Sequence, residues 1–327
     1  MSLVRSSRIA LRSISPSRNI VPQLGLVSSS TAKGSTALLP KSTCLPAAFR
    51  RTLASATGPD SLSSAQTRPL PNKMAALEPH LTPTLFQGIR DFWFEHLENE
   101  NHLVLPAQEH AKRWFFGGEE FDKICMERFS PTLSAIRASG LTTGDEILRI
   151  ANPSCPLDWL SLIILLDQLP RNCYRGEAAA VVFNFFDPMA LQIAMTAIER
   201  GIDMEPEIRW RLAYRTWLFL PLMHSEDIAI HEKAVEKYAR VENDVEDLIE
   251  SEDDLADADK YRSTARKIIK ENAGAAKALA QMHMAFEKKH QVIIQQFGRY
   301  PHRNKVLGRE PTHAETEYLD NGGDTFG

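Results

Sequence analysis

Three short polar segments stand where strongly apolar helical stretches end. They cover residues 167–172, 224–227 and 299–304, with the sequences DQLPRN, HSED and RYPHRN. Charged groups, imidazoles and carboxamides are costly to bury unless they satisfy one another. Three such segments at the ends of apolar helices therefore predict either one shared polar network or a ligand site.

The first segment follows residues 159–166, which are apolar on nearly every side of a helix. Asp167 then lies at a helix C-terminus, where a carboxylate meets the negative end of the helix dipole. It needs a cationic partner, and Arg171 or Arg175, one and two turns further on, could supply a bidentate pair. The segment is then either a structural clasp at this turn or part of a site.

The second segment opens a helix that begins near residue 228. Ser225 or Asp227 can serve as its N-cap, but capping does not require His224. His224, Asp227 and His231 share one helical face, which is a possible metal-ligand pattern. The spacing is looser than that of zinc sites, so we expect no metal ion and no other cofactor.

The third segment crowds Arg299, His302 and Arg303 around Pro301, just after a helix that ends at Gly298. Two guanidiniums and an imidazole form a donor set suited to a carboxylate or a phosphate. The alternative is that they cap helix carbonyls and pair with the acids of the other two segments. To a structural network we assign Asp167, Gln168, Asn172, Arg175, Asp227 and Asn304.

The elements that must position these segments are helices. Thr82 followed by Pro83 predicts one helix start, and Asp187 as an N-cap before Pro188 predicts another, which ends at Gly201. No segment shows the sustained two-residue alternation of a strand. The fold class predicted is all-α, with antiparallel helix pairs in one compact domain over residues 80–320.

Residues 242–259 contain ten acidic side chains and no basic one. The regular Asp and Gly spacing of a calcium loop is absent. Because like charges repel and extend a chain, we interpret this stretch as a solvated, partly disordered insertion.

Five short sequence motifs occur along this chain in the same order as in a known protein family. They are DFWF at 91–94, WF at 114–115, the stretch 165–172 followed by Arg175-Gly176, the stretch 220–227, and FGRYPHRN at 297–304. With them the sequence, over roughly residues 83–320, resembles the family catalogued as domain of unknown function 924. The resemblance implies a tetratricopeptide-like helical fold and no agreed activity, since fold alone does not assign chemistry.

Two functions are compatible with the polar segments. In the first, they form a pocket for hydrolysis or group transfer on an anionic small molecule, with a histidine oriented by a carboxylate as acid or base. The residues assigned to this site are, for anion binding, Arg171, Arg299 and Arg303, and, for catalysis, His224, Glu226 and His302. In the second, the protein is a non-catalytic tetratricopeptide-like module whose groove binds a peptide or protein partner, and the segments only fasten helices together.

The N-terminus carries a different signal. Residues 1–58 contain eight Lys or Arg, twelve Ser and no acidic residue, and Arg5, Arg8 and Arg12 share one helical face. This composition is typical of a mitochondrial presequence, which we place at residues 1–53, followed by a disordered linker over 54–79. Met74 could start a shorter cytosolic form. Processing would leave a net charge of −12, which argues against nucleic-acid binding, and no apolar run approaches the length of a membrane span.

We therefore predict import into the mitochondrial matrix and cleavage after Leu53, three residues after Arg50. N-terminal sequencing of the protein isolated from its native cells should give a chain that begins near residue 54. A chain that begins at residue 1 or 2 would contradict the prediction, and ribosome initiation mapping would detect a form started at Met74.

Overall fold

The computed structural model describes residues 75–252 and 259–326. The predicted presequence, most of the linker and the proposed start at Met74 lie outside the described residues. The linker was predicted to extend to residue 79, and this end is wrong. Leu77 is buried in the core and Glu78–His80 form a short 3-10 helix, η1, because Leu77 and Leu81 both fit apolar space beneath the bundle.

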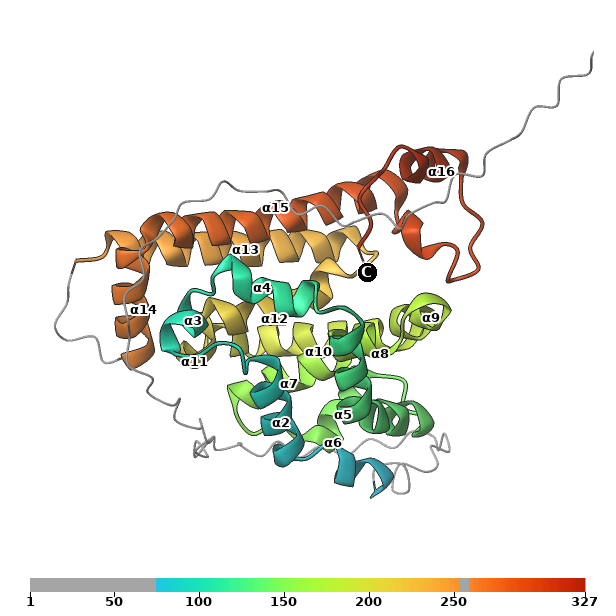
Figure 1. Cartoon of the computed structure of the whole chain (residues 1–327), viewed down its shortest axis with the longest axis horizontal. Helices are drawn as coiled ribbons and strands as arrows, with labels where there is room; N and C mark the ends of the chain where they lie inside the picture. Colours follow the sequence, from blue (N-terminus) through green and yellow to red (C-terminus); the bar gives the residue numbers. More distant parts are fainter. Residues whose placement is uncertain (1–74, 253–258, 327) are drawn as a thin grey trace, which may run out of the picture.

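The described residues form helices and no strand, so the all-α prediction is confirmed. Helix α2 (Pro83–Trp93) begins as expected, with Thr82 Oγ1 accepting a hydrogen bond from Leu85 N at 3.2 Å. The two longest helices, α13 (Ile228–Glu250) and α15 (Ala273–Phe297), run antiparallel along one side of the molecule (Figure 1). A tetratricopeptide-like arrangement of the remaining helices stays a prediction.

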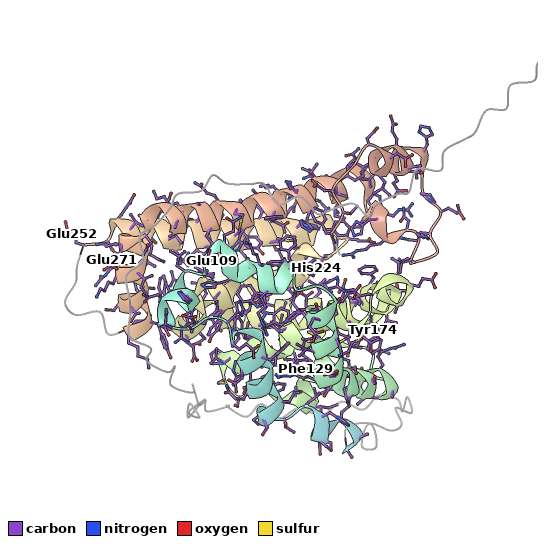
Figure 2. The ribbon with its side chains drawn as sticks, in the orientation of Figure 1. Glu109, Phe129, Tyr174, His224, Glu252 and Glu271 are labelled. Atoms are coloured by element: carbon purple, nitrogen blue, oxygen red, sulfur yellow. The ribbon has the colours of Figure 1, made fainter. Side chains whose placement is uncertain are left out.

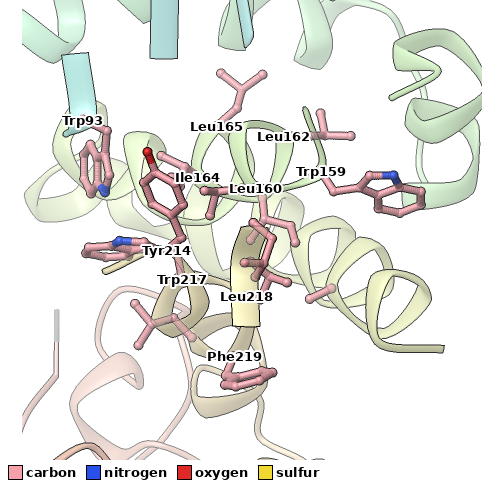
Figure 3. Packing of buried hydrophobic residues seen from close by; sticks show 14 of the residues in the cluster. Trp93, Trp159, Leu160, Leu162, Ile164, Leu165, Tyr214, Trp217, Leu218 and Phe219 are labelled. Carbon is pink, nitrogen blue, oxygen red and sulfur yellow. The ribbon is translucent and has the colours of Figure 1, made fainter. Parts of the chain in front are cut away.

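Helix α7 (Pro156–Asp167) is the centre of the core. Every residue from Leu157 to Asp167 is buried, because helices α2, α10 (Asp187–Glu199) and α12 (Leu212–Met223) contact it on different sides. Figure 3 shows Leu160 of α7 next to Leu218 of α12, with Trp217 and Phe219 on the same helix. Each fully buried aliphatic or aromatic side chain contributes about 1.5–3 kcal/mol, so this contact holds α7 against α12.

The three polar segments follow the ends of three helices. The first joins α7 to the short helix α8 (Leu169–Cys173), and the second joins α12 to α13. The third follows α15, whose chain turns out of the helix at Gly298 with a φ of 67°. Since α7 and α12 pack together and α13 packs on α15, all three ends come to one region.

Asp187 was predicted as an N-cap, and this is wrong. The chain is already helical through the π-helical turn η3 (Val182–Phe186), and Asp187 N bonds to Val182 O, five residues back. The wider turn accommodates Pro188, which has no N–H to donate and whose ring crowds a regular helix. Asp187 therefore faces the interior with its carboxylate available to cations. The predicted end of this helix at Gly201 is confirmed by its φ of 74°.

The interpretation of residues 242–259 as a solvated insertion is wrong for its first part. Helix α13 continues through Glu250, and the helical repeat turns Asp244 inward beside Val241 and Val245. There its carboxylate pairs with Arg209 at 2.6 Å and with Arg215 at 2.6 Å. Residues 253–258 lie outside the described residues, and the next helix, α14 (Lys260–Glu271), is capped by Asp259.

Within residues 75–252 and 259–326, one helical stretch is long and apolar enough to cross a membrane by length and composition, Gly176–Glu199. This is weak evidence, because the core helix of a soluble protein passes the same test. The stretch carries Asp187 in its middle, and that carboxylate pairs with Arg171 inside the bundle.

We predict that Asp244→Asn lowers the free energy of unfolding by about 3–5 kcal/mol, because it strips a buried guanidinium of its charge partner. Burial alone would raise the pKa of Asp244, but Arg209 and Arg215 together hold it below its ordinary 3.8. The contribution should therefore be complete above pH 3.8 and lost as the pH falls below it. Urea unfolding checks this, with the exposed Asp247→Asn on the same helix as the control. Equal effects of the two substitutions at neutral pH would contradict the structural role.

Candidate functional site

The first and second segments meet at one carboxylate. Asp167 is fully buried at the end of α7, and His224, which follows α12, places Nδ1 2.7 Å from its Oδ1. Gln168 Nε2 donates to the other oxygen at 2.5 Å, and Arg171 Nη2 lies 3.6 Å from Oδ1. Asp167 thus has the compensation that its position at a helix C-terminus requires. Figure 2 shows His224 between the α13–α15 pair and the helices below it.

The third segment joins the same cluster through Arg303. Its Nη1 donates to the backbone oxygen of His224 at 3.1 Å and lies 3.8 Å from Asp187 Oδ2. Asp187 in turn binds Arg171 Nη2 at 2.7 Å. Asp187 therefore links the two arginines, and we name Asp167, Arg171, Asp187, His224 and Arg303 the central cluster.

Glu226 lies at the edge of the central cluster and is fully engaged. Arg309 donates to both of its carboxylate oxygens, at 2.7 and 3.0 Å, and Tyr300 N donates to it at 3.0 Å. Tyr300 also donates its hydroxyl to Met223 O at 2.6 Å. Burial would raise the pKa of Glu226, yet these donors lower it. Glu226 therefore holds the chain after α15 onto the start of α13, and these bonds favour a positioning role over the acid–base role predicted.

His302 is close to the cluster but does not share its hydrogen bonds. Burial, and then the charge of Arg303, lowers its pKa to about 4, so its ring is neutral at neutral pH. No hydrogen bond of normal geometry reaches either ring nitrogen, although the Phe326 backbone lies nearby. His302 is thus an uncharged ring next to Arg303, and nothing in the cluster orients it as a base.

Three predicted residues lie outside the central cluster. Arg299 is held by Glu315 at 2.6 Å, and this hydrogen bond is the main reason that the pKa of Glu315 falls to about 2. Arg175 pairs with Asp122 of α5 (Gly118–Ala138) at 2.8 Å and not with Asp167. Asp227 is exposed and accepts from Ala229 N as the N-cap of α13. The charge of Arg299 is thus matched by Glu315 of a neighbouring helix, which speaks against the anion-binding role predicted for it.

The remaining network residues are structural. Asn172 donates to Gln168 O at 3.1 Å and so closes the turn after α7. Asn304 is buried and lies near Glu315, whose pKa it helps to lower, so it belongs with the Arg299 pair.

His231 does not face His224. Its Nδ1 lies 2.7 Å from Glu287 Oε1, both side chains are fully buried, and its Nε2 lies 2.9 Å from Ser225 O. Among the described residues, no group of three or more His, Cys, Asp or Glu side chains could hold a metal ion. His231 therefore anchors the turn that carries His224.

The charges of the central cluster determine the protonation state of His224. Burial would raise the pKa of Asp167, but His224 and Arg171 lower it, so this carboxylate is ionised. Burial, and then Arg171, lowers the pKa of His224 in spite of Asp167, so its ring is neutral. A carboxylate only accepts hydrogen bonds, so Nδ1 carries the proton. Nε2 is then an acceptor that bonds to none of the described residues, and the His224 side chain is 13% exposed.

Two residues of this arrangement were missed from the sequence. Asp187 was assigned as a helix N-cap. Only the apolar residues on both sides of it in the sequence could have indicated that its side chain lies in the interior. Arg309 follows Gly308 in a polar stretch with no apolar pattern, so no signal indicated its bond to Glu226.

The fold and the cluster define a compact all-helical protein with a buried Asp–His pair framed by arginines. Residues 89–323 match the family described as bacterial protein of unknown function (DUF924), and the chain belongs to this family. It is also similar to the solved structure of a protein of unknown function, ATU0120, from Agrobacterium tumefaciens. That structure is 27% identical, the match covers 73% of this chain and 98% of the other, and the TM-score is 0.48. Comparison with curated proteins gave no match.

We predict that Asp167→Asn costs about 3–5 kcal/mol of stability, because it leaves Arg171 and His224, which are 14% and 13% exposed, without the charge that balances them. His224→Gln should cost only about 1 kcal/mol, since an amide can still donate to Asp167. Urea unfolding at neutral pH checks both. Asp122→Asn, which breaks the half-exposed pair with Arg175, serves as the control and should cost less than about 1 kcal/mol. An Asp167→Asn variant as stable as this control would contradict the account.

Proposed function

We propose that the central cluster binds a small molecule through a phosphate or carboxylate group and that His224 acts on it as a general base and acid. The observation that carries the proposal is the state of His224. Its Nδ1 is fixed by Asp167 at 2.7 Å, while no hydrogen bond from the described residues reaches its Nε2 and the side chain is 13% exposed. A neutral imidazole oriented by a carboxylate in this way is equipped to take a proton at Nε2.

Arg303 supports the anion-binding half of the proposal. It is 4% exposed, its nearest carboxylate oxygens lie 3.8 and 4.0 Å away, and its Nε is buried without a partner in the described chain. Its guanidinium lies 4.5 Å from the Phe183 ring and 4.4 Å from the Tyr300 ring, which hold it in place. A buried guanidinium with spare donors is rare, and an anionic ligand would satisfy it.

In the proposed reaction a water molecule attacks the group held by Arg303. His224 Nε2 takes a proton from that water as the new bond to oxygen forms, and the resulting imidazolium is stabilised by Asp167. The same proton then passes from Nε2 to the leaving group as the old bond breaks, so the histidine returns to its starting state. Burial raises the pKa of the nearby thiol Cys173 to about 12, which speaks against a cysteine nucleophile.

An interaction module remains the second candidate, because one exposed aromatic pair favours it. Phe115 and Phe116, at the end of α4 (Gln108–Phe115), are 55% and 52% exposed. The aromatic residue Phe94, in contrast, is buried. Segments that only hold helices together do not require an unbonded His224 Nε2 or an Arg303 guanidinium with unused donors. The ligand site is therefore the better-supported proposal. A matrix location, which rests on residues outside the described part, belongs to this proposal as well.

We predict saturable binding of inorganic phosphate to the full chain at neutral pH, measured by NMR as shifts of the His224 ring signals. Arg303→Gln should weaken this binding at least tenfold, because it removes the charged donor at the site. Arg299→Gln is the matched control, since Arg299 lies four residues earlier and is committed to Glu315. The proposal fails if phosphate does not bind, or if the two substitutions weaken binding equally.

A further inference from the structure

The chain beyond the last helix folds back toward the central cluster. Helix α16 (His313–Asp320) is followed by Gly322, with a φ of 78°, and by Gly323, whose N–H donates to Tyr318 O at 2.9 Å. A Cβ at Gly323 would lie 2.4 Å from the Tyr318 ring. The two glycines therefore permit a reversal, and the described residues after Gly323 run back toward the beginning of α13 (Figure 1).

Phe326 lies in a slot made by three flat rings. Its ring stacks on His290 with centroids 3.5 Å apart and an interplanar angle of 22°. It meets Tyr300 and His302 edge to face, at 6.4 and 6.3 Å. We name the walls formed by His290, Tyr300 and His302 the aromatic slot.

The aromatic slot carries no charge of its own at neutral pH. Burial lowers the pKa of His290 well below its ordinary value, although its Nδ1 lies 2.8 Å from Phe286 O. Burial and Arg303 lower the pKa of His302 to about 4. Neutral flat rings favour a flat apolar group, for which stacking and edge-to-face contacts are available.

The aromatic slot adjoins the proposed anion site. Tyr300 is common to both, since the Arg303 guanidinium lies 4.4 Å from the ring against which Phe326 also packs. His302, a wall of the slot, is the residue before Arg303. A molecule with a flat group in the slot would therefore present an attached anionic group toward Arg303.

Few strong bonds hold the returning segment in the slot. Asp324 lies 3.7 Å from Lys289, with both side chains about half exposed, and such pairs contribute little. Tyr318 donates its hydroxyl to Asp324 O at 3.3 Å. A surface depression of about 390 Å³, lined in part by Gln296, Gly322 and Gly323, adjoins the turn. Phe326 also packs against the small apolar cluster of Ile293, Ile294 and Tyr300, so its displacement would give up these apolar contacts together with the stacking.

We propose that the aromatic slot is a subsite for the flat aromatic part of a small aromatic anion, and that Phe326 occupies it until such a ligand displaces it. The inference rests on the proposed function, because Arg303 must hold the anionic group.

The test compares phenyl phosphate with inorganic phosphate as probes for the full chain, by isothermal titration calorimetry. Phe326→Ala should tighten the binding of phenyl phosphate about fivefold, the worth of one aromatic contact that no longer competes. The affinity for inorganic phosphate should not change, because phosphate alone does not reach the slot. Phe326→Leu, which keeps apolar bulk but cannot stack, should act in the same direction if the alanine variant is unstable. Phe116→Ala, at an exposed position away from the slot, is the control and should change neither affinity.

The outcomes separate this inference from the proposed function. If both probes bind every variant with wild-type affinity, Phe326 is only a packing residue, and the subsite is overturned while the anion site stands. If neither probe binds the wild type or the variants, both proposals are overturned.

Discussion

The Asp167 carboxylate is the group on which the rest of this structure depends. It is the last residue of α7, a helix buried on all sides, and it has no exposed surface. A negative charge at this end of a helix opposes the dipole, and burial removes the water that would otherwise solvate it. The carboxylate is stable there only because His224, Arg171 and Gln168 surround it. The ends of α7 and α12 must therefore lie together.

Each charged group that surrounds Asp167 needs a further partner of its own. Arg171 forms a second ion pair, with Asp187. Asp187 is in position for this pair because a π-helical turn keeps the chain helical past Pro188. An outer layer, in which Glu226 binds Arg309 and Tyr300, fixes the chain after α15. After these bonds are made, His224 Nε2 and the Arg303 guanidinium keep unused capacity. The proposed ligand site rests on these two groups.

Much of this arrangement could be predicted from residue chemistry. A carboxylate at the wrong end of a helix, a histidine with no capping role and arginines after a glycine-terminated helix all indicated groups in need of partners. Helix starts at Thr82 and the end at Gly201 followed from local preferences that tertiary packing did not override. Local reasoning was wrong where a residue had two possible roles. Asp187 before a proline is an ordinary cap in an isolated helix, and only the π-helical turn makes it an interior acid.

Ion-pair partners on other helices could not be predicted from local sequence. Arg299 and Arg303 are alike in sequence, and their difference comes from Glu315 in a helix that only the fold brings close. In the sequence nothing distinguishes Asp244 from the acidic residues around it. In the structure its place in the helical repeat directs its carboxylate toward Arg209 and Arg215. A run of like charges predicts a solvated surface on average, yet one inward position can bind two buried or half-buried cations.

The protonation state of His224 tests the central claim most directly. In the full chain with ¹⁵N-labelled histidine, NMR at neutral pH should show a neutral ring with the proton on Nδ1 and an unprotonated Nε2. The ring should titrate below its ordinary pKa of 6.5, since burial and Arg171 outweigh the effect of Asp167. A ring that is protonated on both nitrogens at neutral pH, or one with its proton on Nε2, would contradict the account. Either result would mean that Nε2 cannot accept a proton.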